Sequence, residues 1–238
     1  MGRGPSIEGR KNAEDARRAK VFTKLIREIT IAARTGADPA GNPRLRAAID
    51  KALSSNMSKD TVERAVRRGS GAEGADNMQE LRYEGYGPSG VALIIDCMTD
   101  NPQRTVADVR HALSKHGGNL GTSGSVAFQF HRVGEIVVDT SAPGSEDKLL
   151  EAALDAGADD VQNDGGHSTV LCSPENFEAV KKALQGAGFA PQRADVVMRP
   201  ENRVSVPDDA AETLRDLLEW LEELDDVQEV YHNAALAD

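Results

Sequence analysis

The chain has 238 residues, of which 39% are hydrophobic and 28% charged, and it carries a formal net charge of −11 at pH 7. That length accommodates one large domain or two to three small ones, and the composition is typical of a soluble globular protein and excludes a largely disordered one. No apolar run approaches the roughly 20 residues needed to span a bilayer, and residues 1–20 lack the hydrophobic segment of a secretory signal. We therefore expect a cytoplasmic protein without membrane contact.

The charge is divided along the chain. Residues 1–70 contain 16 Lys and Arg against 8 Asp and Glu, a net charge of +8, whereas residues 71–238 contain 12 basic and 31 acidic residues, a net charge of −19. A basic module on an acidic body is typical of a polyanion-binding protein, because the basic part contacts phosphate and the acidic part limits indiscriminate binding. The alternative is that both parts are merely solvated surfaces.

The basic part of the chain is predicted to be a three-helix bundle. Apolar periodicity and stop signals predict helices over 12–34, 42–53 and 58–69, with Asn12, Asn42 and Ser58 as N-caps. Short connections between helices favour a small bundle. The small-residue segment 71–77 then follows as a linker.

The first predicted helix has two different faces. Its apolar residues share one side, and a row of cations occupies the other: Arg17, Lys20, Lys24, Arg27 and Arg34. The third helix adds Arg64, Arg67 and Arg68 near its end. A basic face at helical spacing is often only solvated, but few acids interrupt this one, which favours contact with nucleic acid.

The acidic part alternates strand and helix patterns, which predicts two small α/β domains. We expect an α+β fold in which a three-helix bundle precedes two ferredoxin-like split βαβ domains, one inserted in the other. The expected domains are 1–76, then 77–132 with 205–238, and the inserted 133–204. The predicted strands cover 91–98, 125–130, 134–139, 168–172, 194–199 and 227–231, and the predicted helices cover 104–116, 145–156, 174–187 and 207–224. A tight turn is expected between the second and third of these strands.

The glycine-rich stretch HGGNLGTSGSVAFQF, residues 116–130, raises the question of a phosphate-binding loop. Such a loop follows a strand and opens a helix, so that helix N-terminal N–H groups face the anion. Here the order is reversed, because a predicted helix precedes the glycines and a strand follows them. We therefore interpret Gly117 and Gly118 as a helix stop, and Gly121 and Gly124 as positions where backbone passes close to backbone.

No catalytic or metal-binding arrangement is evident in the sequence, and we expect neither an enzyme nor a cofactor. Cys97 and Cys172 lie in apolar runs and are expected to be buried, reduced thiols. The five histidines have no metal-like spacing, and His111 and His116, five residues apart, match one helical face poorly. A group of acids on or just past the last helix is interpreted as a solvated face, with a docking surface for a basic protein partner as the alternative: Glu219, Glu222, Glu223, Asp225 and Asp226.

Several long segments resemble one family. YEGYGPSGVALIIDCMTDNPQRTVADVRHALSKHGGNLGTSGSVAFQF, residues 83–130, is similar to the central fingerprint of the YebC/PmpR family, which includes the mitochondrial translational activator of cytochrome c oxidase. Residues 22–34, 42–71 and 225–234 also resemble segments of that family. The resemblance implies three domains and no catalytic activity. Bacterial members are described as probable transcriptional regulatory proteins that bind DNA, and some members act in translation at the ribosome.

The resemblance is weakest at the N-terminus. Many members begin with a His-Ser-Lys-Trp segment and a basic run, whereas residues 4–9 here lack the aromatic residue and several cations. Arg10 and Lys11 keep matching cations. We therefore expect a DNA-binding regulator of transcription, with an rRNA-associated translation factor as the alternative. The candidate nucleic-acid-binding residues are Arg10, Lys11, Arg17, Arg18, Lys20, Lys24, Arg27, Arg34, Arg64, Arg67 and Arg68.

Overall fold

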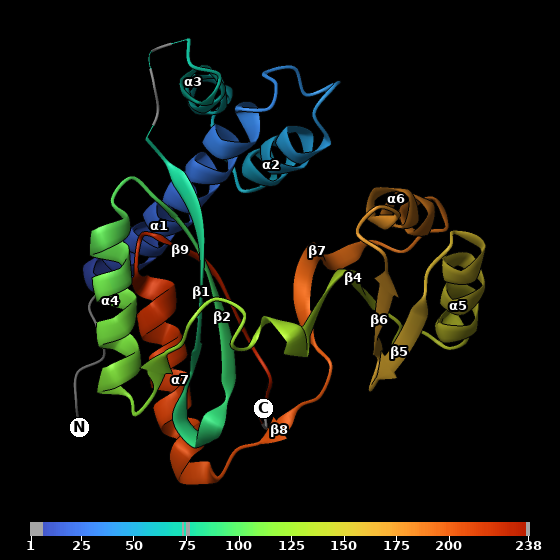
Figure 1. Cartoon of the computed structure of the whole chain (residues 1–238). Coiled ribbons are helices and arrows are strands. Elements are labelled where there is room, and N and C mark those ends of the chain that lie inside the picture. The colour runs from blue at the N-terminus through green and yellow to red at the C-terminus, as the bar shows by residue number, and fades with distance from the viewer. Residues whose placement is uncertain (1–6, 73, 75–76, 237–238) are drawn as a thin grey trace. The chain divides into compact units, whose positions relative to one another are not determined.

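The computed structural model describes residues 7–72, 74 and 77–236, with side chains from residue 14 onward (Figure 1). The chain divides into two compact units. Of the described residues, the first contains those from 7 to 125 together with 206–230, and the second contains 126–205 with 231–236. Each unit is described by itself below. Among the described residues, no helix is both long enough and apolar enough to cross a membrane.

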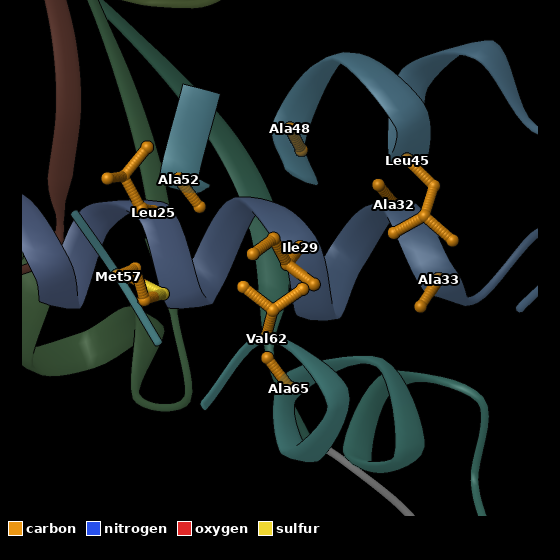
Figure 2. Packing of buried hydrophobic residues seen from close by; sticks show 10 residues of the cluster. All are labelled: Leu25, Ile29, Ala32, Ala33, Leu45, Ala48, Ala52, Met57, Val62 and Ala65. Atoms are coloured by element: carbon orange, nitrogen blue, oxygen red, sulfur yellow. The ribbon is translucent and has the colours of Figure 1, made fainter. Parts of the chain in front are cut away.

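The predicted three-helix bundle is confirmed, and it begins the first unit. Helices α1 (Ile7–Ala33), α2 (Pro43–Ser54) and α3 (Lys59–Gly69) pack around a core to which all three contribute (Figure 2). Ile29 and Leu45 lie in that core with no exposed surface. Burying such side chains is the main source of stability for helices as short as α2 and α3, which are marginal in isolation.

Asn42 connects the end of α1 to the start of α2. Its Oδ1 accepts a hydrogen bond from the Leu45 N–H at 3.0 Å, which is the predicted N-cap contact. Its Nδ2 donates to the Ala32 carbonyl at 2.7 Å and to the Gly36 carbonyl at 2.8 Å. One buried amide therefore satisfies backbone groups at both helix ends and fixes the turn between them.

A four-stranded sheet with two helices completes the first unit. The strand order is β3-β1-β2-β9, with β1 (Gln79–Tyr86) antiparallel to both β2 (Ala92–Thr99) and β3 (Asn119–Leu120). Helix α4 (Pro102–Lys115) joins β2 to β3 across the intervening β1, which is a split βαβ connection. Helix α7 (Asp208–Glu223) packs against α4 and leads to β9 (Val227–His232), which lies beside β2. The turn Pro88–Gly90 connects β1 to β2.

The second unit has the ferredoxin-like order. Its elements run β4 (Phe130–Asp139), α5 (Ser145–Asp155), β5 (Asp160–Asp164), β6 (His167–Cys172), α6 (Phe177–Gly186) and β7 (Pro191–Pro200), and the sheet order is β5-β6-β4-β7 with antiparallel neighbours. A 3-10 turn, Ala127–Gln129, precedes β4, and the short strands β8 (Val204–Ser205) and β10 (Ala234–Ala235) pair in parallel. The α+β fold class expected from the sequence is confirmed, while the domain boundaries stay a prediction.

Several local predictions were wrong. Asn12 does not begin the first helix, because α1 already starts at Ile7. The predicted strand over 125–130 is absent up to residue 129, where the chain forms the 3-10 turn Ala127–Gln129 instead. Residues 131–133 form no turn, because β4 continues through them and pairs with β7 from Phe130 onward. Strand β1 was also missed, since its sequence QELRYEGY carries charges at three of eight positions and lacks a long apolar run. The short, mostly exposed β5 was missed for the same reason.

The glycine-rich loop is a closely packed structural turn. Gly117 follows α4 with φ +73°, the left-handed conformation expected of a glycine after a helix end. A Cβ on Gly118 would lie only 2.2 Å from the Tyr86 carbonyl oxygen, so backbone passes directly over backbone there. The Gly124 N–H, which an anion would need, donates instead to Oε1 of the buried Glu84 at 2.9 Å. The loop therefore holds strand β1 in place.

Candidate nucleic-acid interface

Helix α3 presents a short row of arginines. Its apolar face packs on α1 through Val62 and Ala65, so the opposite face, with Arg64, Arg67 and Arg68, is exposed. These arginines follow i, i+3 and i+4 spacing and therefore share one side of the helix. Arg64 Nη2 lies 3.1 Å from an Asp60 carboxylate oxygen, an exposed pair whose net contribution to stability is small.

A close helix contact brings a fourth arginine to the same end of the bundle. Gly69, the last residue of α3, lies against Thr30 and Ala33 of α1, where a Cβ would come within 2.1 Å of the Thr30 carbonyl oxygen. Arg34 directly follows Ala33 and is exposed. The ends of α1 and α3 therefore meet, and we call their four exposed arginines the arginine cluster: Arg34, Arg64, Arg67 and Arg68.

Two further candidates, Arg17 and Arg18, are exposed on the N-terminal half of α1. The guanidinium carbon of Arg18 lies 5.2 Å from the centre of the Phe22 ring, a cation–π contact that orients the side chain without burying it. Arg10 and Lys11 lie in α1, but their side chains are outside the described part of the chain.

Lys20, Lys24 and Arg27, in the middle of the predicted basic row, have partners within the chain. Lys20 Nζ lies 3.2 Å from a Glu223 carboxylate oxygen, and Lys24 Nζ donates to the Glu222 carbonyl at 3.2 Å. Burial lowers the pKa of Lys24, and the nearby acids Glu229 and Glu222 oppose that shift only in part. These two lysines therefore face the C-terminal end of the acidic helix α7.

Arg27 is fully engaged inside the first unit. Its Nη1 donates to Asp226 Oδ1 at 2.9 Å, to the Asp225 carbonyl at 2.5 Å and to the Met98 carbonyl at 2.8 Å. Only 15% of its side chain is exposed. Arg27 was predicted to bind phosphate, whereas the structure places it in an ionic contact between the bundle and the sheet.

Asp226 is the acceptor at the centre of this contact. It receives hydrogen bonds from Arg104 Nη2 at 2.9 Å and from Thr105 Oγ1 at 2.8 Å in addition to Arg27. Burial alone would raise the pKa of Asp226, but the hydrogen bonds from Thr105, Arg104 and Arg27 outweigh it and hold that pKa below its ordinary value. The prediction of a solvated acid was wrong for Asp226, which is 6% exposed, because its solvation is replaced by these donors.

Several further cations on α2 and α3 were not among the predicted nucleic-acid-binding residues. Arg44 bridges Glu28 of α1 and Glu80 of β1, and Arg46 donates to the Pro39 carbonyl at 3.0 Å, so both have partners near the bundle. Lys51 and Lys59 are exposed. Their spacing around α2 and α3 was the signal that could have identified them, since neither falls on an apolar face.

Elsewhere in the described residues, no group of three or more His, Cys, Asp and Glu side chains is arranged to hold a metal ion. Cys97 and Cys172 are free and buried as predicted, and burial raises the pKa of Cys97 to about 12. His111 and His116, in contrast, do converge, because the helix end turns His116 back so that both rings contact Trp220 of α7.

Models of two protein domains match almost the whole chain. Residues 4–72 match the TACO1/YebC protein N-terminal domain, and residues 78–234 match the TACO1/YebC second and third domain. Among curated relatives, a probable transcriptional regulatory protein of Xanthomonas campestris is 57% identical over 98% of this chain and 97% of its own length. One of Cupriavidus taiwanensis, with the same description, is 56% identical over the same shares.

A solved structure matches as well. The crystal structure of a conserved hypothetical protein from Aquifex aeolicus is 42% identical, with a TM-score of 0.84 over 94% of this chain and 93% of that one. The fold described above is therefore the fold of that protein too.

Proposed function

Because the chain belongs to the TACO1/YebC family, we propose that it is a non-enzymatic regulator of gene expression that binds DNA through the exposed arginines of its helical bundle. Relatives described as probable transcriptional regulatory proteins support the regulatory role. The exposed surface of the bundle supports the nucleic-acid contact.

The arginine cluster is the observation that carries this proposal. Four exposed guanidinium groups at the joined ends of α1 and α3 form a positive surface on an otherwise acidic chain. Guanidinium groups bind phosphate oxygens in a planar, two-pronged geometry, which makes arginine well suited to a nucleic-acid backbone. Arg17 and Arg18 form a second exposed cationic pair in the N-terminal half of α1.

Lys20, Lys24 and Arg27 are not part of the proposed surface. All three are less exposed than the cluster arginines, and their contacts join α1 to the end of α7 or to the loop after it, so phosphate would have to break a contact between elements. For Arg27 that displacement would leave Asp226 buried with one donor fewer, which is costly.

The proposed contacts position the protein on the nucleic-acid backbone, since phosphate contacts carry no direct sequence information. Binding should therefore weaken steeply with salt. We propose to measure the affinity for a fluorescein-labelled DNA duplex by anisotropy at several salt concentrations, with wild type and R64A/R67A/R68A. Each lost phosphate contact should reduce the slope of log affinity against log salt by about one.

A matched control removes three exposed cations from helices outside the bundle: Arg110, Lys148 and Lys182. The R110A/K148A/K182A variant has the same net charge as the test variant and should keep the wild-type slope. Equal slopes in all three proteins would contradict the proposal. Cross-linking and sequencing from growing cells then separates the two targets, since promoter DNA supports the proposal and rRNA supports the translational alternative.

A further inference from the structure

A surface cavity of about 600 Å³ lies beside helix α7, in the first unit, and no residue of the arginine cluster lines it. The proposed DNA contact does not use it. Its lining combines one indole, one imidazole and three carboxylates: Trp220, His116, Asp216, Glu219 and Glu223, with Leu224.

Trp220 is the only tryptophan of the chain, and 37% of it is exposed. The His116 ring stands edge-on to the indole with centroids 5.3 Å apart, and His111 does the same at 5.8 Å. His116 is itself fixed, because its Nδ1 donates to the Ala112 carbonyl at 2.8 Å. The indole is therefore held by two rings while part of its surface stays open to a ligand.

The three carboxylates determine which ligand suits this indole. Asp216, Glu219 and Glu223 recur at i, i+3 and i+7 along α7, so they line the side on which Trp220 projects. A nucleic-acid base could stack on the indole, but its phosphates would meet three negative charges. A cation meets attraction from both the carboxylates and the indole face.

One of the three carboxylates, Glu223, already pairs with a cation of this chain that does not itself line the cavity. Lys20 Nζ lies 3.2 Å from Glu223, with both side chains well exposed, at 39% and 66%. That pair shows that Glu223 accepts a basic side chain, while Asp216, Glu219 and the exposed part of Trp220 stay available to a ligand. An arginine fits the remaining space best, since its flat guanidinium can stack on an indole and bind a carboxylate at the same time.

We propose that this cavity is a docking site for an arginine of a basic segment in a partner protein. The guanidinium stacks on Trp220 and pairs with Asp216 and Glu219. Neighbouring basic residues of the segment lie along the acidic side of α7. The regulator thus has two separate surfaces, one for phosphate and one for arginine.

Trp220 allows a direct test, since all tryptophan emission comes from the proposed site. Titrating the full chain with the peptide (Arg-Gly)5 should change that emission saturably, and (Lys-Gly)5 should bind more weakly. Anisotropy of the labelled arginine peptide then gives affinities for variants. Removing the cation–π contact in W220L should weaken binding by about threefold to tenfold.

The charge variants are D216N/E219Q and, as a matched control on the same helix, D209N/E212Q. The first pair should weaken peptide binding by about tenfold, and the control by less than about twofold, because screening attenuates charges beyond the contact. Equal losses in both pairs, or a bound peptide without any emission change, would overturn the proposal. So would self-association that W220L abolishes, because the occupant would then be a second copy.

DNA affinity serves as the independent readout. W220L and D216N/E219Q should bind the DNA duplex as wild type does, since the arginine cluster lies elsewhere on the unit. Loss of peptide binding with DNA binding intact therefore concerns only the docking site, and loss of DNA binding in R64A/R67A/R68A concerns only the proposed function.

Discussion

Arg27 Nη1 lies 2.9 Å from Asp226 Oδ1, which joins the first helix of the chain to the loop before its last long strand, 199 residues later. The same carboxylate accepts from Arg104 and Thr105 of α4. Three elements that are far apart in sequence therefore share one buried anion. Such an arrangement is costly to break, because Asp226 would be left buried without a donor, or the largely buried Arg27 without its carboxylate.

Replacing Asp226 with Asn should destabilise the protein. The amide places N–H groups opposite two guanidinium groups and removes the charge that compensates them. We expect the free energy of unfolding, measured by urea denaturation, to fall by about 3 kcal/mol. The neighbouring D225N changes an exposed side chain and should cost no more than about 0.5 kcal/mol. A D226N protein as stable as D225N would contradict the role assigned to this carboxylate.

The same carboxylate should make stability depend on pH. Its pKa is lower in the folded chain than in the unfolded chain, where it is about 3.9. The folded state thus binds fewer protons, so the stabilisation is fully present above about pH 4 and is lost as the pH falls through the folded pKa. The difference in unfolding free energy between wild type and D226N should shrink on acidification. A difference that stays constant throughout the acid range would refute this assignment.

Much of the fold was predictable because capping residues and apolar periodicity mark its helices in the sequence. Asn42 and Ser58 cap α2 and α3 as expected, and the buried runs of β2 and β6 were identified from apolar residues alone. Strands β1 and β5 were not, since a strand paired at an edge or covered on one face needs no continuous apolar run.

The candidate site was only partly predictable for a different reason. A helical projection places Lys20, Lys24 and Arg27 on the polar side of α1, and it cannot show that α7 and its loop approach that side. The convergence of His111 and His116 on Trp220 was equally hidden, because it depends on how α4 packs against α7. Whether a polar helix face binds solvent, a ligand or another element of the protein therefore depends on tertiary contacts.

Gly69 and Gly186 provide a matched pair of glycine substitutions, since each is the last residue of a helix. A Cβ on Gly69 would clash with the Thr30 backbone, whereas a Cβ on Gly186 meets nothing within 4 Å. We expect G69A to lose about 1–3 kcal/mol of stability. G186A should be neutral or slightly stabilising, because alanine favours helix. Thermal unfolding followed by circular dichroism measures both, and an unchanged midpoint in G69A would contradict the close contact.

The glycine-rich loop gives a prediction of another kind. G118A should destabilise the protein, because its Cβ would come within 2.2 Å of the Tyr86 carbonyl oxygen. The loop N–H of Gly124 is already bonded to Glu84, so ATP with magnesium should leave the wild-type melting temperature unchanged. A saturable stabilisation by nucleotide, lost in G118A, would show that the loop binds phosphate after all.

The Arg27 contact changes what a truncated protein would report. Cutting the chain near residue 72, where one domain model ends, removes the bundle and also removes one of the donors to Asp226. In the remaining protein Asp226 would be buried with one hydrogen-bond donor fewer. Weaker DNA binding by such a protein would then reflect lost stability as well as the missing arginines. The bundle and the sheet belong to one compact unit, so their functions are better dissected by side-chain replacement than by deletion.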